Sequence, residues 1–226
     1  MNNSQYIDLD KLISEYEEDL RTIKGERLIM KNYPKVLTLS AASSFEYQIK
    51  NCCKEFIDNP KLPIEPNYPN ISSLSKRKPI TDQMFAKLEG YNDNGIEHLD
   101  AMKFYNLFGG QPFKSNVIEY FNTELSLRIE NISDKIAGLQ SLLGQEQKYD
   151  FDYAKQLDLK DELGRCTFDD AEKAYLNLKL RRNRVAHDYI NGLSDTFEDI
   201  QKFYNKAIIY VIALEKSIRS LTVSIT

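Results

Sequence analysis

The chain has 226 residues, of which 42% are hydrophobic and 28% are charged, a composition that excludes disordered and collagen-like proteins. The 30 Lys and Arg against 34 Asp and Glu give a net charge of −4, so the chain has no global basic field and any contact with nucleic acid needs a local basic patch. The three cysteines, two of them adjacent, do not make a disulfide framework and favour a reducing compartment.

The sequence also lacks the patterns that are typical of several other classes of site and location. The chain opens without the basic and apolar regions of a signal peptide, and its longest apolar run, residues 207–214, is far shorter than a membrane span. Walker A, GxGxxG and GxSxG motifs are missing, and the few Cys and His lack zinc-finger spacing. We therefore expect a cytoplasmic protein with no membrane partner, no metal and no cofactor.

The first part of the chain is expected to form two long helices. Apolar residues recur at spacings of three and four from residue 7 to about residue 30, which predicts an amphipathic helix. A second helix is predicted to begin at Pro34 and to run to about residue 58. Because this segment is apolar nearly all round, we expect it to lie at the centre of a bundle.

The next part of the chain differs in character. Five of the seven prolines lie between residues 59 and 80, so no long helix can cross this stretch and an irregular loop is expected. Thr81 can cap a short helix, and another is predicted over residues 96–107, with His98 near its start as a surface residue. We interpret residues 59–112 as an insertion packed on the main bundle.

The second half of the chain returns to long helices. We expect four helices, over residues 115–143, 152–163, 167–186 and 195–221, of which the one over residues 152–163 is weak. A capping box of Thr167 and Asp170 opens the third of these helices, and Ser194 is expected to cap the last. No segment shows the alternation of strands, and no repeat appears. The prediction is an all-α bundle of four to five long helices in a single domain, residues 1–226.

One segment carries a set of residues suited to phosphodiester chemistry. Four cations lie within six positions, directly before one of the only two histidines; they are Lys179, Arg181, Arg182 and Arg184. Arginine offers a bidentate fork for phosphate, so these cations are predicted to bind RNA phosphates. His187 can transfer protons near neutral pH, and Asn183 shares its helix face four residues earlier and can orient the imidazole.

Cleavage of RNA without a metal needs a base for the 2′-hydroxyl, an acid for the leaving 5′-oxygen and a cation for the phosphorane. A single histidine serves one of the two proton-transfer roles, and a second copy of the chain in a homodimer is an economical source of the other. Asp188 is a further candidate for holding the tautomer of His187, ranked below Asn183 because consecutive residues seldom face each other.

A purely structural interpretation of the same residues stays open at this point. Basic residues in the last turn of a helix complement its dipole without any catalytic role. On an ideal helix Arg182 lies about 140° from His187, so a long side chain or a loosened last turn has to bring the two groups together.

The segment resembles the Arg-x4-His motif of the HEPN superfamily in its fuller form, Arg-Asn-x-x-x-His, here Arg182-Asn183-Arg184-Val185-Ala186-His187. The helical segment at residues 40–47 also looks like the family's first-half helix, which carries a polar residue toward the site. The resemblance covers roughly residues 7–58 and 113–221, and the chain looks like the longer defence-associated HEPN proteins of prokaryotes.

The resemblance implies an endoribonuclease that acts as a toxin or antiviral-defence effector, with a homodimer that brings two motifs together and with an antitoxin or other defence partner. Arg182 and His187 carry over as catalytic residues and Asn183 as a supporting residue. Glu46 is a candidate for a residue that contacts these groups and positions them, and the alternative for it is a solvated carboxylate on a helix face. Tyr189 extends the match to Arg-x4-His-x-Tyr, the tyrosine that is adenylylated in HEPN toxins paired with a nucleotidyltransferase antitoxin. Some HEPN proteins bind nucleotides or proteins without cleaving, so a non-catalytic helical module is the alternative.

Overall fold

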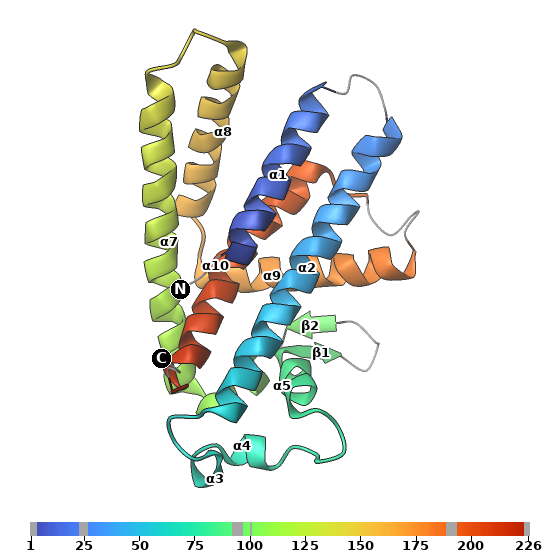
Figure 1. Cartoon of the computed structure of the whole chain (residues 1–226), viewed down its shortest axis with the longest axis vertical. Coiled ribbons are helices and arrows are strands. Elements are labelled where there is room, and N and C mark those ends of the chain that lie inside the picture. Colours follow the sequence, from blue (N-terminus) through green and yellow to red (C-terminus); the bar gives the residue numbers. More distant parts are fainter. Residues whose placement is uncertain (1–3, 23–26, 92–96, 100, 189–193, 224–226) are drawn as a thin grey trace.

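The computed structural model describes the chain except for residues 1–3, 23–26, 92–96, 100, 189–193 and 224–226. The predicted all-α class is confirmed. Six helices of 18 or more residues lie in the described ranges; they are α1 (Ser4–Thr22), α2 (Arg27–Asp58), α7 (Gln111–Gln140), α8 (Gln147–Gly164), α9 (Phe168–His187) and α10 (Phe197–Ser220). Figure 1 shows α9 running crosswise to α2, with its C-terminal end extending past that helix.

Helix α10 is the centre of the bundle and packs against α2, α7 and α9. Its apolar face is fully buried along most of its length, because apolar residues recur every three or four positions. Thr196 caps it by accepting from the backbone N–H of Asp199, whose carboxylate accepts from the N–H of Thr196 in return. The prediction that Ser194 is the cap is therefore wrong, since the reciprocal pair of a capping box needs an acidic residue three positions later.

Helix α2 is the second long element of the core and buries Phe45, Ile49 and Phe56 completely. It begins at Arg27 rather than at Pro34, so the predicted start is wrong by about two turns. Proline lacks an N–H and disfavours a helix interior. Here Pro34 is buried and Thr38 donates a hydrogen bond of 2.7 Å to its carbonyl, so tertiary packing outweighs the local preference.

Residues 59–112 hold short elements at the lower end of the bundle in Figure 1. The described part of this region forms four short helices and a 3-10 turn; they are α3 (Ile64–Asn67), α4 (Pro69–Ser72), α5 (Ile80–Leu88), α6 (Ala101–Tyr105) and η1 (Asn106–Phe108). Helix α5 packs against α2 and α6. Helix α5 thus lies directly on one of the two central helices.

A small antiparallel hairpin also lies in this region, formed by β1 (Glu89–Tyr91) and β2 (Glu97–Leu99), with His98 opposite Gly90. The predicted helix over residues 96–107 is therefore wrong in its first turn, and its helical part begins only at Ala101. Strands of three residues are too short to show an alternating pattern, which is why the sequence did not reveal them.

Candidate active site at the end of helix α9

Helix α9 starts as the sequence predicts. Thr167 accepts from the backbone N–H of Asp170 at 3.2 Å, and the Asp170 carboxylate accepts from the N–H of Thr167 at 3.1 Å. The helix then continues without a break to His187. Its buried residues recur at spacings of three, four and seven; they are Ala171, Ala174, Tyr175, Leu178, Lys179 and Val185.

Arg182 lies on this inward stripe, four residues after Leu178 and three before Val185. Its Nη2 pairs with Oε2 of Glu46 on α2, and about a quarter of each side chain is exposed. The Arg182 Nε is buried without a hydrogen-bond partner among the described residues. The structure therefore brings together two residues that the sequence analysis related only through a resemblance.

The same carboxylate has a second partner on its own helix. Lys50 Nζ lies 2.9 Å from Oε1 of Glu46 and 3.0 Å from Oδ1 of Asp82 on α5. Burial lowers the pKa of Lys50, but the hydrogen bonds with the two carboxylates outweigh it and leave the pKa raised. Four side chains of alternating charge thus link α9, α2 and α5, and we call Arg182, Glu46, Lys50 and Asp82 the charge chain.

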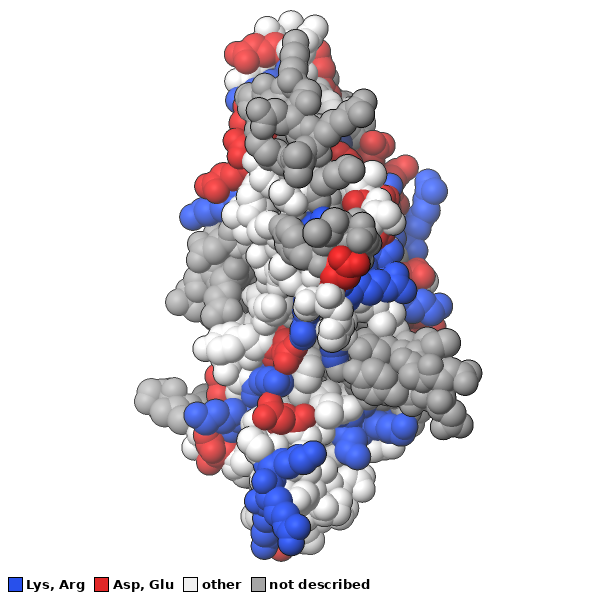
Figure 2. Space-filling model, turned by 90° about the vertical axis from the view of Figure 1, so that its right-hand side faces the viewer, with Lys and Arg blue, Asp and Glu red and all other residues white. Residues whose placement is uncertain are grey.

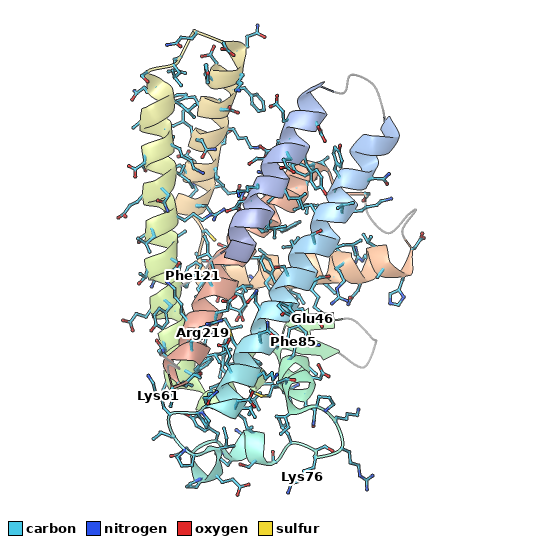
Figure 3. The ribbon with its side chains drawn as sticks, in the orientation of Figure 1. Glu46, Lys61, Lys76, Phe85, Phe121 and Arg219 are labelled. Carbon is cyan, nitrogen blue, oxygen red and sulfur yellow. The ribbon has the colours of Figure 1, made fainter. Side chains whose placement is uncertain are left out.

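Lys179 lies one turn before Arg182 and is only 7% exposed. Its ammonium sits 5.1 Å from the centre of the Phe85 ring, and Lys50 sits 5.2 Å from the same ring. Burial lowers the pKa of Lys179 to about 8; Glu46 opposes this shift, while Arg182 and Lys50 add to it. Figure 3 shows Glu46 and Phe85 near each other where α2 passes α5.

Arg181 faces a different direction and is held in a separate set of contacts. Its Nη2 and Nε lie 2.7 Å and 2.9 Å from Oδ1 of Asp195, and its guanidinium lies 4.3 Å from the centre of the Phe203 ring. It also donates to Asn177 one turn earlier. These contacts tie α9 to α10 and to the segment before it. The predicted role of Arg181 in phosphate binding stays a prediction.

His187 is the last residue of α9, and its side chain is exposed. Because the helix is regular to this point, the 140° between Arg182 and His187 applies, and no loosened turn brings them together. Asn183 is half-buried on the face of His187, whereas Arg184 and Asp188 are exposed. The N–H of Asp188 donates to the carbonyl of Arg184 at 2.8 Å. Tyr189 lies outside the described residues.

Three residues of this site were not named by the sequence analysis. Lys50 had a visible signal, since Glu46 and Lys50 form an i, i+4 pair of opposite charge. Asp82 and Phe85 had none, because they come from the region of residues 59–112 and approach α9 only through the tertiary fold. No local pattern in the sequence relates positions about 100 residues apart.

The three cysteines are free and buried. Burial raises the pKa of Cys166 to about 11 and of Cys52 to about 12, so neither is a ready thiolate at neutral pH. Within the described ranges no group of three His, Cys, Asp or Glu is placed to hold a metal ion. No helix in the same ranges is both long and apolar enough to cross a bilayer.

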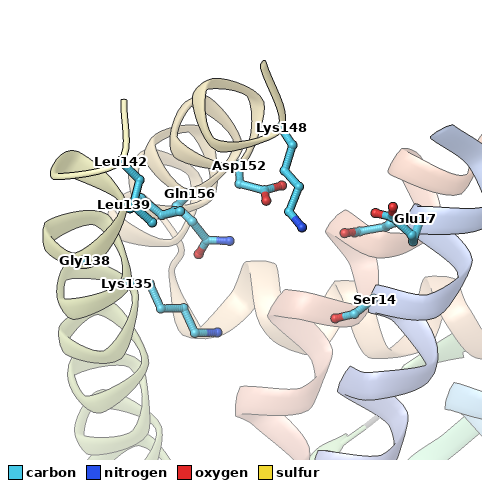
Figure 4. A pocket seen from close by; sticks show the side chains of 10 residues that line it. Ser14, Glu17, Lys135, Gly138, Leu139, Leu142, Lys148, Asp152 and Gln156 are labelled. Atoms are coloured by element: carbon cyan, nitrogen blue, oxygen red, sulfur yellow. The ribbon is translucent and has the colours of Figure 1, made fainter. Parts of the chain in front are cut away.

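A pocket of about 610 Å³ lies elsewhere, between α1 and the pair α7 and α8. Figure 4 shows acidic and basic side chains on its walls, with Lys148 directed toward Glu17 across the opening. None of the predicted site residues lines it, and its charges are of both signs. It therefore has no part in the site at the end of α9.

The chain was also compared with known proteins. A family model described as RiboL-PSP-HEPN matches residues 4–220, a span that includes α9, Glu46 and residues 59–112. The comparisons found no matching curated protein and no matching solved structure.

Proposed function

This chain belongs to the RiboL-PSP-HEPN family, a membership that indicates an RNase-type or nucleotide-binding module, and from that premise we propose that it is a metal-independent endoribonuclease. The observation that carries the proposal is the arrangement on α9. Arg182 is fixed against α2 by Glu46, while His187 is exposed five residues later. Arg182 as the phosphate-binding cation and His187 as the proton-transfer group thus lie in the last turns of one rigid helix, and both side chains contact solvent.

In the proposed reaction His187 takes the proton of the ribose 2′-hydroxyl, and the 2′-oxygen attacks the adjacent phosphorus. Arg182 stabilises the extra negative charge of the phosphorane. The P–O5′ bond then breaks, and the leaving oxygen receives a proton. The products are a 2′,3′-cyclic phosphate and a 5′-hydroxyl, and the reaction needs no oxidant and no metal.

The second proton-transfer group is proposed to come from a second copy of the chain. The 140° between Arg182 and His187 on one helix separates the two groups within a protomer, and the only other histidine, His98, lies in the hairpin. A homodimer in which two α9 ends meet supplies the missing acid from the same residue. We further propose that the enzyme works in the cytoplasm as a toxin or antiviral-defence effector with a protein partner.

A non-catalytic nucleotide-binding or protein-binding module is the second candidate, and one observation favours it. Arg181 is engaged by Asp195 and Arg182 by Glu46, so both arginines have carboxylate partners without any substrate. In that case the basic segment is a helix end stabilised by ion pairs.

The test is cleavage of tRNA and mRNA by the purified protein in EDTA, with analysis of the product ends. His187→Ala is expected to abolish cleavage, and His98→Ala serves as the matched histidine control that keeps it. Cleavage by both variants, or none by the unchanged protein when it is dimeric, contradicts the ribonuclease and favours the non-catalytic module. Sedimentation of the active protein as a monomer contradicts the shared site.

A further inference from the structure

The charge chain joins residues 59–112 to Arg182, and we propose that Lys50 and Asp82 are positioning residues that set how strongly Arg182 binds a phosphate group. The inference rests on the proposed function in that Arg182 is taken to be the phosphate-binding residue. It assigns a role to α5, an element that the Arg-x4-His motif does not include.

The geometry shows one carboxylate shared by two cations. Oε1 of Glu46 pairs with Lys50 at 2.9 Å, and Oε2 of Glu46 pairs with Arg182. Lys50 is in turn shared, because Asp82 lies 3.0 Å from the same ammonium. A change at either end of such a chain alters the pairing at the other end.

Phe85 keeps Lys50 within reach of both carboxylates. Its ring is only 5% exposed, and the ammonium groups of Lys50 and Lys179 lie 5.2 Å and 5.1 Å from its centre. A cation over an aromatic face is attracted by the negative face of the ring. Lys50 is thereby held between Glu46 and Asp82 rather than released into solvent.

The chain of charges predicts effects of opposite sign. When Asp82 loses its charge, Lys50 pairs with Glu46 alone, so Glu46 holds Arg182 less strongly and Arg182 binds phosphate more tightly. When Lys50 loses its charge, Glu46 pairs with Arg182 alone, so Arg182 binds phosphate less tightly. A role of both residues in stability only would make both losses act in the same direction.

The cluster is open to ligands and to ions. The side chains of Lys50 and Asp82 are 32% and 54% exposed, and those of Glu46 and Arg182 about a quarter. Figure 2 shows Lys and Arg interleaved with Asp and Glu over the face of the molecule on which α5 and the end of α9 lie. An incoming phosphate can therefore compete with Glu46 for Arg182.

The experiment measures the Kd of a labelled single-stranded RNA in the His187→Ala background, where cleavage does not interfere. Asp82→Asn is expected to tighten binding about 2- to 5-fold and Lys50→Met to weaken it by a similar factor, the size expected for partly exposed ion pairs. Lys54→Met on α2 and Lys87→Met on α5, both exposed, report the general effect of losing one positive charge. Thermal unfolding of each variant shows that the fold is kept.

A double-mutant cycle separates the proposal from general electrostatics. In an Arg182→Met background the effects of Asp82→Asn and Lys50→Met, beyond those of the control lysines, are expected to disappear. Persistence of these effects without Arg182, effects of the same sign, or unchanged binding by Arg182→Met would each overturn the proposal. Cleavage that does not depend on His187 contradicts the proposed ribonuclease but leaves this binding test standing.

Discussion

The two halves of α9 differ in what holds them and in what they present. The first half is capped by Thr167 and buries Ala171, Ala174 and Tyr175 in the core. The second half carries the arginines and ends in the exposed His187. The second half also buries Leu178, Lys179 and Val185, so its arginines lie on a helix that packing holds along its whole length.

Polar groups in the first half also serve the fold. Tyr105 on α6 donates to Glu172 at 2.7 Å, and its hydroxyl lies 3.0 Å from that of Tyr210 on α10. Burial raises the pKa of Glu172, although the hydrogen bond from Tyr105 opposes the shift. In the second half, by contrast, the Arg182 side chain is paired yet keeps contact with solvent. The difference separates a buried polar group that packs in the core from a paired group that is partly exposed to solvent.

The sharpest test of this comparison is to remove the charge of Arg182 in the second half. Arg182→Met is expected to lower the rate of RNA cleavage by about 100- to 1,000-fold, because the phosphorane loses its cation. Thermal unfolding should change little, since a partly exposed ion pair contributes only about 1 kcal/mol or less. Arg165→Met, at the exposed end of α8, is the matched control. Equal cleavage by the Arg182 variant and its control contradicts this assignment.

The apolar face of α9, to which Leu178 belongs, should respond in the opposite way, through stability. Leu178→Ala is expected to lower the free energy of unfolding by about 3 kcal/mol, because Leu178 is fully buried and a cavity remains. Urea unfolding measures the loss. Leu157→Ala on α8, where the leucine is 40% exposed, should change it by no more than about 0.5 kcal/mol. Similar losses for the two variants would show that α9 is not held by this face.

Lys179 lies near the boundary between the two halves of α9, and its buried charge is expected to lower the free energy of unfolding. Lys179→Met should raise the free energy of unfolding at pH 7 by about 1.5 kcal/mol, because a buried charge is replaced by an apolar chain against Phe85. The lowered pKa of Lys179 means that the unfolded state binds more protons between about pH 8 and 10.5, so the wild type gains stability as pH rises through this window.

The difference in the free energy of unfolding between Lys179→Met and the wild type, measured by urea unfolding, should therefore shrink between pH 7 and pH 9.5. Lys87→Met, exposed on α5, is the control without such a pH dependence. A variant less stable than the wild type at pH 7 would show that the Lys179 charge stabilises the fold.

The smallest effect is expected at the cap. Thr167→Ala should cost about 1 kcal/mol at pH 7, since it removes the acceptor for the Asp170 N–H. Hydrogen bonds from Thr167 lower the pKa of Asp170, so their contribution is present above the unfolded pKa and is lost as pH falls through the folded one. Unfolding at pH 7 and pH 3 tests this, with Thr123→Ala in the middle of α7 as control. A cost that does not depend on pH contradicts the role of the Asp170 carboxylate.

Much of the fold was accessible to reasoning from the sequence where local rules decide. The capping box at Thr167 was predicted and is confirmed, because its two residues lie three positions apart and their hydrogen bonds are local. The start of α2 and the hairpin were missed. Pro34 is buried by tertiary packing, and strands of three residues carry no period that a sequence can show.

The sequence by itself determined the helical class, the scarcity of histidine and the spacing of Arg182, Asn183 and His187, because helix periodicity and residue chemistry are properties of neighbouring positions. Only the tertiary structure decided which partner each cation has. Arg181 and Arg182 are adjacent in sequence, yet their side chains point about 100° apart on the helix and meet Asp195 and Glu46 respectively. The contact between Arg182 and Glu46, which are 136 positions apart, depends on how the helices cross, and that crossing is fixed by core packing rather than by any local pattern.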